Sequence, residues 1–157
     1  MEQIETVVDS RERELIKLLP ETIKIEPLHI GDIQFQKSGQ NVLLLERKTM
    51  ADLASSIKDG RYHEQKARLM ASAHLHMTGY IFEGPLRNIG GISSKTLIGA
   101  ITNTFVRDKM VVFRTMSLQE TATFVKSMAE KIAKFGLEVT WLFLFPLIIY
   151  PNRPSTR

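Results

Sequence analysis

Short apolar runs bounded by turn residues alternate along the chain with stretches in which apolar residues recur every three or four positions. The first pattern is typical of β-strands and the second of helices that pack on one side. Strands are predicted over residues 4–8, 22–25, 33–35, 42–46, 79–83 and 110–114, and helices over 11–19, 49–58, 61–76, 94–105 and between Ser117 and Gly136. This alternation predicts an α/β sandwich with a mixed central sheet flanked by helices.

The last predicted helix carries more apolar surface than one sheet needs. Its first stripe comprises Leu118, Ala122, Val125, Ala129 and Ile132, and its second comprises Phe124, Met128 and Phe135. One stripe is enough to dock a helix on its own sheet. The second stripe, followed by the apolar segment Trp141–Tyr150, predicts a subunit interface through residues 117–150. The alternative is that both stripes are buried within a single chain.

Composition narrows the class of protein. With 157 residues, 43% hydrophobic and 24% charged, the chain has the size and make-up of one globular domain. The net charge of +4 and the pI of 9.4 favour a polyanionic partner such as DNA. The absence of cysteine excludes disulfides and thiol nucleophiles.

No targeting segment is evident in the sequence. The N-terminus is acidic and has no apolar core of a signal peptide, and Trp141–Tyr150, interrupted by Pro146, is too short to cross a bilayer. We therefore expect an intracellular protein of the nucleus or cytoplasm.

A compact charged motif follows the apolar run Val42–Leu45. In the motif Glu46-Arg47-Lys48-x-x-x-Asp52, Glu46 and Lys48 project to one face of the strand and Arg47 to the other. With Asp32, which follows Gly31 at a turn, Glu46 can hold Mg²⁺ or Mn²⁺, and Asp9 is a further candidate ligand.

The cations of this motif have different predicted roles. Lys48 can orient the attacking water or bind a phosphate oxygen. Arg47 is expected to anchor Asp52 or another acid, and Asp52 can pair with either cation.

A second set of polar residues lies on the following helix. Arg61, Gln65 and Arg68 share one helix face at i, i+4 and i+7, a spacing that can follow a phosphate backbone. An ordinary solvated helix face is the alternative.

Four motifs together resemble those of one nuclease family. They are Asp9-Ser10-Arg11-Glu12, Gly31-Asp32, Glu46-Arg47-Lys48-x-x-x-Asp52, and Ser56-Ile57-x-Asp59-Gly60-Arg61-Tyr62-x-x-Gln65-x-x-Arg68-Leu69. In this order and spacing they resemble the nuclease domain of the XPF family of structure-specific endonucleases, over about residues 4–135. The resemblance implies a restriction-endonuclease-like core in residues 1–136, followed by a C-terminal segment over 137–157.

The resemblance also implies an activity. It implies a Mg²⁺- or Mn²⁺-dependent endonuclease that cuts branched, forked or flap DNA and pairs with an identical or related chain. It places Arg47 in the catalytic motif, Arg61 and Gln65 near the cleft, and Arg11 beside Asp9. The family's helix-hairpin-helix motifs are not evident after Phe135. A phosphodiesterase acting on small or cyclic nucleotides and a non-catalytic scaffold subunit are the alternatives.

Overall fold

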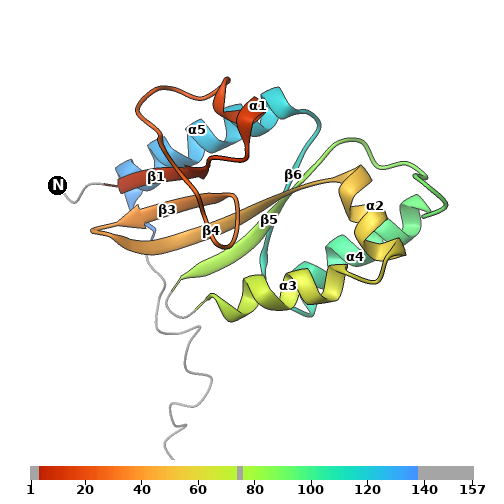
Figure 1. Cartoon of the computed structure of the whole chain (residues 1–157). Helices are drawn as coiled ribbons and strands as arrows, with labels where there is room; N and C mark the ends of the chain where they lie inside the picture. Colours follow the sequence, from red (N-terminus) through yellow and green to blue (C-terminus); the bar gives the residue numbers. More distant parts are fainter. Residues whose placement is uncertain (1–3, 74–75, 138–157) are drawn as a thin grey trace, which may run out of the picture.

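A computed structural model describes residues 4–73 and 76–137, and in this part of the chain six strands and five helices alternate (Figure 1). The strands are β1 (Ile4–Asp9), β2 (Lys24–Glu26), β3 (Ile33–Lys37), β4 (Gln40–Thr49), β5 (Met77–Glu83) and β6 (Val111–Thr115). The helices are α1 (Arg13–Ile16), α2 (Met50–Lys58), α3 (Tyr62–Ala71), α4 (Ser94–Val106) and α5 (Leu118–Phe135). The α/β class predicted from the sequence is confirmed.

The six strands form one mixed sheet in the order β2-β1-β3-β4-β5-β6. β3 is antiparallel to both β1 and β4, whereas β5 is parallel to β4 and β6, and β2 is parallel to β1. Strand β4 lies inside the sheet and its end leads directly into α2. The parallel half of the sheet therefore brings the carboxyl ends of β4, β5 and β6 to one edge.

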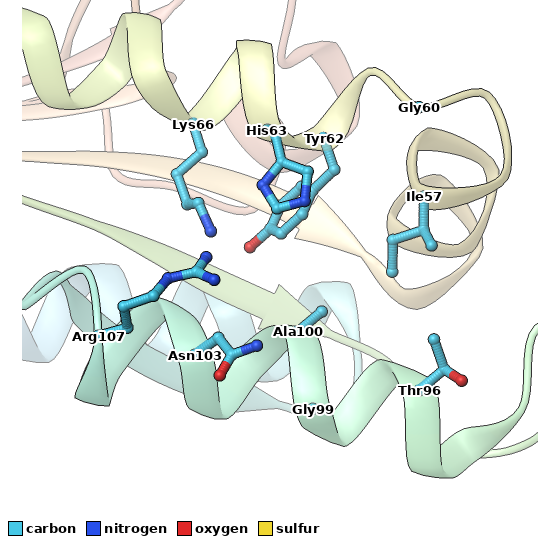
Figure 2. A pocket seen from close by; sticks show the side chains of 10 residues that line it. All are labelled: Ile57, Gly60, Tyr62, His63, Lys66, Thr96, Gly99, Ala100, Asn103 and Arg107. Carbon is cyan, nitrogen blue, oxygen red and sulfur yellow. The ribbon is translucent and has the colours of Figure 1, made fainter.

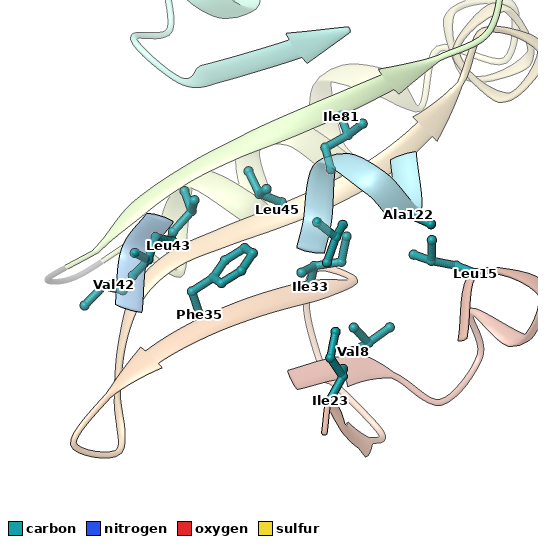
Figure 3. Close-up of a cluster of buried hydrophobic side chains, with 12 residues drawn as sticks. Val8, Leu15, Ile23, Ile33, Phe35, Val42, Leu43, Leu45, Ile81 and Ala122 are labelled. Atoms are coloured by element: carbon teal, nitrogen blue, oxygen red, sulfur yellow. The ribbon is translucent and has the colours of Figure 1, made fainter. Parts of the chain in front are cut away.

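Alternating side chains of the strands build two hydrophobic cores, one on each face of the sheet. Leu43, Leu45 and Ile81 face the core that α1 and α5 cover, part of which Figure 3 shows. Leu44 and Tyr80 face the core shared with α2, α3 and α4. Because the two faces alternate along β4, the residues that follow Leu45 are assigned to faces by the same period of two.

Two helices are shorter than the sequence pattern predicts, and β4 is longer. Helix α1 spans only Arg13–Ile16, and the amides of Leu18 and Leu19 bond three residues back in turns. Helix α3 ends at Ala71, where the hydroxyl of Ser72 donates to the carbonyl of Leu69. Such local side-chain bonds to the backbone compete with continued helix.

Helix α5 buries most of both its apolar stripes within this chain. Val125 and Ile132 belong to the core between the sheet and helices α1 and α5, and Met128 packs against that core. The centre of the Phe124 ring lies 4.8 Å from that of the Phe113 ring. Phe135 alone among the residues of both stripes is largely exposed, at 71%. The core of the same chain therefore partly covers Phe124 and Met128 and leaves Phe135 exposed, and the interface predicted through residues 117–150 stays a prediction.

Part of the predicted interface, including Trp141–Tyr150, lies outside the described residues. Within the described residues, no helix is both long enough and apolar enough to cross a membrane.

We expect Val125→Asp to destabilise the fold by about 3 kcal/mol or more, because an unpaired carboxylate would replace a fully buried side chain. The free energy of unfolding from urea titration measures the effect. Lys126→Asp, at the exposed neighbouring position of α5, is the matched control and should change stability by less than about 0.5 kcal/mol. Equal stability of the two variants would contradict the burial of α5.

Candidate active site

The predicted charged residues meet in a hollow of about 300 Å³ where the end of β4 enters α2. Acidic, basic and hydroxyl side chains line it: Glu12, Asp32, Glu46, Arg47, Lys48, Asp52, Ser55, Ser56, Arg61 and Gln65. Of the ten residues predicted to act in catalysis or DNA binding, seven line this hollow. Asp9, Arg11 and Arg68 do not.

Asp32 is held in place mainly by backbone hydrogen bonds. Its amide donates to the carbonyl of Leu45 at 2.8 Å, and its carboxylate accepts from the amide of Arg47, also at 2.8 Å. The preceding Gly31 has a φ of +71°, and a β-carbon there would lie 2.5 Å from Leu44 Cδ1. Only glycine fits this turn, because it combines a left-handed backbone with direct contact against the core.

The environment of Asp32 favours its protonated form. Burial is the main cause and raises its pKa to about 7, and the carboxylates of Glu12 and Glu46 add to this effect. The hydrogen bond from the amide of Arg47 acts in the opposite direction. A cation bound beside Asp32 would stabilise its ionised form and so offset the effects of burial and of the neighbouring carboxylates.

Glu46 and Lys48 lie on the same face of β4, as the alternation predicts. Burial raises the pKa of Glu46, while the positive charges of Lys48 and Arg68 oppose that rise. Lys48 is only 7% exposed, and its ammonium group donates to the amide oxygen of Gln65 at 2.8 Å. Gln65 thus holds Lys48 beside the acids, a role that differs from the DNA contact predicted for it.

Arg47 projects to the opposite face and forms the centre of a partly buried ionic network. Its Nε and Nη2 atoms donate to the two carboxylate oxygens of Glu83 at 2.7 and 2.6 Å, and Nη1 donates to Glu12 at 3.1 Å. The hydroxyl of Thr121 on α5 donates to Glu83 at 2.6 Å. Of the partners predicted for Arg47, Asp52 or another acid, the structure shows the second: Glu83 and Glu12 accept from its guanidinium.

Glu83 was missed by the sequence analysis, although its position carried a signal. It is an acid at the end of an otherwise apolar strand, next to the strand that carries Arg47. Burial disfavours its ionised form, yet hydrogen bonds from Arg47 and Thr121 outweigh burial and leave its pKa below the usual value.

Asp9 lies next to Asp32 along the sheet but does not line the hollow. Both of its oxygens accept from Arg11, and Oδ2 also accepts from the amide of Leu28 at 2.8 Å. The side-chain hydrogen bond from Arg11 is the main cause that lowers its pKa to about 2. Asp9 therefore ties the loop after β1 to the loop before β3, and its predicted role as a metal ligand stays a prediction.

Of the remaining predicted residues, Asp52 and Arg61 line the hollow, and Arg68 and Arg11 do not. Asp52 is exposed in the first turn of α2, where its amide donates to the hydroxyl of Thr49. Arg61 pairs with Asp59 at 2.9 Å on the exposed turn before α3. Arg68 is exposed further along α3, and its charge acts on Glu46. Arg11 is 73% exposed and pairs with Asp9.

The donor set suits a small hard cation with few protein ligands. Within the described residues, no three His, Asp or Glu side chains lie close enough together to hold a metal ion. Four acids line the hollow. Glu12 already accepts from Arg47, and Asp52 is exposed on α2, which leaves Asp32 and Glu46 as the partly buried carboxylates that could share an ion. Mg²⁺ is commonly held by one or two carboxylates and completes its coordination with water. Asp32 and Glu46 therefore fit such an ion.

The fold and this hollow together define a class of protein. A mixed sheet covered by helices on both faces, with Asp, Glu and Lys gathered at the end of a central strand, has the architecture of the XPF nuclease fold. The family model for the ERCC4 domain matches residues 8–128, and the chain belongs to the ERCC4 domain family. The resemblance inferred from the four motifs is thereby confirmed.

Individual relatives support this assignment. The structure-specific endonuclease subunit MUS81 of Rattus norvegicus is 37% identical in an alignment 127 residues long, which covers 72% of this chain and 22% of that protein. The crossover junction endonuclease MUS81 of Debaryomyces hansenii is 31% identical over 150 residues, 83% of this chain and 23% of the relative. The chain thus spans under a quarter of the length of these relatives.

A solved structure gives the same fold. XPF from Aeropyrum pernix, in complex with DNA, is similar to this chain with a TM-score of 0.64 and 27% identity. The similarity covers 84% of this chain and 66% of that one.

We expect the stability of the metal-free protein to depend on the ionisation of Asp32. Because its pKa is about 7 in the folded state, against an ordinary value of 3.8 for an aspartate side chain, the folded state binds more protons between these values. The free energy of unfolding therefore falls as pH rises from 4 to 7. Asp32→Asn should remove this loss and be more stable than the wild type by up to about 4 kcal/mol at pH 8.

Urea titrations in a chelator from pH 4 to 8 measure the difference between variant and wild type. Asp9→Asn is the control of opposite sign, because the lowered pKa of Asp9 stabilises the fold above pH 4. That variant should be less stable than the wild type at pH 7. A pH-independent difference for Asp32→Asn would contradict the buried state of this carboxyl.

Proposed function

We propose that the chain is the nuclease domain of a Mg²⁺- or Mn²⁺-dependent endonuclease that cuts branched, forked or flap DNA. One observation carries the proposal: Asp32, Glu46 and Lys48 line a single hollow in a chain of the ERCC4 domain family. The names of the relatives, and the DNA complex of the similar structure, support DNA as the substrate.

The residues of the hollow would have different roles in phosphodiester hydrolysis. Asp32 and Glu46 would hold the cation, whose charge activates the water and relieves charge on the transition state. Lys48, fixed by Gln65, directs its ammonium group toward the scissile phosphate or the attacking water. The attacking water releases a proton to solvent and its oxygen forms a bond to phosphorus, while the bond to the leaving sugar oxygen breaks and that oxygen takes up a proton from solvent.

Basic side chains beside the hollow would hold the DNA backbone. Arg61 lines the hollow, and Arg68 is exposed about two turns further along α3. Contacts of this kind neutralise phosphates regardless of base sequence, so they position the substrate without reading it. Recognition of a branch would then depend on the shape of the DNA and on parts of the protein that contact its arms.

We expect Glu46→Gln and Asp32→Asn to lower the cleavage rate by about two to three orders of magnitude, the scale of losing one preorganised electrostatic group. DNA affinity should persist, because it depends on Lys and Arg. Lys48→Ala should also lose cleavage, but it should retain metal affinity because Lys48 is not a ligand. Single-turnover cleavage of a forked DNA and calorimetric titration with Mn²⁺ measure the two properties.

Glu64→Gln, at an exposed position of α3 outside the hollow, is the matched control and should cleave like the wild type. Plain duplex and cyclic dinucleotides serve as competing substrates in the same assay. If the Glu46→Gln variant cleaved DNA at the wild-type rate, the active site would not lie on β4. If the wild type cleaved only cyclic dinucleotides, the protein would be a small-nucleotide phosphodiesterase.

A surface on α4 is our proposed site of pairing with a second nuclease-type domain. Ile98, Phe105 and Val106 are exposed on α4, with Phe105 61% and Val106 62% exposed. Met116, after β6, is also exposed. Large exposed apolar side chains support an interface there, beside the predicted interface through residues 117–150.

We expect the double variant Phe105→Glu and Val106→Glu to be monomeric at concentrations at which the wild type is a dimer. Light scattering measures the mass, and thermal unfolding should be nearly unchanged because both residues are exposed. Ser127→Glu, exposed on α5, is the control and should dimerise as the wild type does. A wild-type chain that is monomeric at high micromolar concentration would exclude self-pairing through α4.

A further inference from the structure

A second hollow lies between the start of α3 and α4, on the other side of the α2–α3 turn from the candidate active site. Its volume is about 370 Å³, within the roughly 300–1,000 Å³ of pockets that bind small molecules. Figure 2 shows its two walls, with Tyr62 and His63 projecting from α3 and Asn103 and Arg107 from α4. We call this hollow the α3–α4 groove.

The interior of the groove is apolar and open. Ile57 and Ala100 contribute aliphatic surface, and the hydroxyl of Tyr62 lies 2.7 Å from that of Thr104, which fixes the ring. Gly60 and Gly99 also line the groove, and a β-carbon at either would have no atom within 4 Å. The groove thus has free space where two side chains are lacking, and a flat apolar group can enter it.

Planar and cationic groups stand at the rim of the groove. The imidazole of His63 and the guanidinium of Arg107 come from opposite walls, and Asn103 supplies an amide (Figure 2). The buried Lys66 is neutralised by Asp108 at 2.6 Å, and Arg107 also bonds Asp108 at 2.9 Å while its side chain remains 55% exposed. Among the described residues that line the groove there is no Asp or Glu.

The α3–α4 groove and the candidate active site share one short turn as their common wall. Ser56 and Arg61 line the active-site hollow, whereas their sequence neighbours Ile57 and Gly60 line the groove. A polymer that leaves the hollow across Arg61 would therefore reach the groove after passing this turn. A small free ligand would gain nothing from such continuity.

We propose that the α3–α4 groove holds one unpaired nucleotide of the DNA strand that continues past the candidate active site. This inference rests on the proposed function and adds a subsite to it. The base lies against the ring of His63 and the guanidinium of Arg107, since both groups stack on bases. The amide of Asn103 can bond the base edge, and the positive charge of Arg107 faces the phosphate.

Filling the groove tests the proposal. Gly99→Leu adds a side chain whose β-carbon would meet no atom within 4 Å, and replacing a helical glycine should not destabilise α4. Fluorescence anisotropy in a chelator measures binding to a forked DNA with unpaired arms and to a blunt duplex of the same paired sequence. The variant should bind the fork at least about fivefold more weakly than the wild type, and the duplex equally.

Forks that carry one abasic nucleotide at successive arm positions locate the held base. At one position, the missing base should weaken wild-type binding as much as Gly99→Leu does. It should weaken the variant no further, because two changes that remove the same contact are not additive. His63→Ala, which removes a ring from the rim, should show the same non-additivity at that position.

Ser127→Leu, an added leucine on the exposed face of α5, is the matched control and should bind both DNAs as the wild type does. Wild-type fork affinity in a folded Gly99→Leu protein, or an equal loss at every abasic position, would overturn the proposal. If cleavage still requires Glu46 in that case, the proposed function stands without this subsite. A wild-type protein that binds neither DNA would overturn both.

Discussion

The bidentate ion pair between Arg47 and Glu83 connects the parts of the fold that the candidate site needs. The side chain of Arg47 links β4 to β5, to Glu12 at the start of α1 and, through Thr121, to α5. The backbone amide of the same residue donates to Asp32. A buried pair of this kind adds little stability over an apolar core, but removing one partner leaves an unpaired charge. The network therefore fixes β4 relative to β5, α1 and α5. The placement of the carboxylates in the hollow depends on where β4 lies.

The carboxyl groups of the hollow lower the stability of the metal-free protein, and the rest of the fold compensates for this loss. Asp32 and Glu46 are both partly buried, and burial disfavours the ionised form of each. Lys48 is held near them by Gln65, and two well-packed cores lie on the faces of the sheet. Acids gathered in this way are unfavourable in the metal-free fold and become favourable when a cation binds. The arrangement is thus suited to its chemistry more than to its stability.

Much of the fold followed from the sequence, because hydrophobic periodicity depends on local spacing. The strand alternation placed Glu46 and Lys48 on one face and Arg47 on the other, and a short motif assigned Asp32 to their neighbourhood. Partners across the sheet carried no local signal. Glu83 lies 36 residues from Arg47, and the contact of Asp9 with Leu28 joins the end of β1 to a loop 19 residues further along the chain. The sequence left open whether the stripes of α5 pack within the chain or at an interface, because a stripe on a helix does not say which surface covers it.

A substitution of Gly31 would affect both the packing of the core and the position of Asp32. The residue has a left-handed backbone and contacts Leu44 of the core, and it directly precedes Asp32. Any side chain at this position would displace a core leucine and a catalytic candidate together. Loss of activity after such a change would not separate a chemical defect from a folding defect. Inherited or engineered variation at position 31 is therefore informative about the architecture, whereas the isosteric change at position 32 isolates the chemistry.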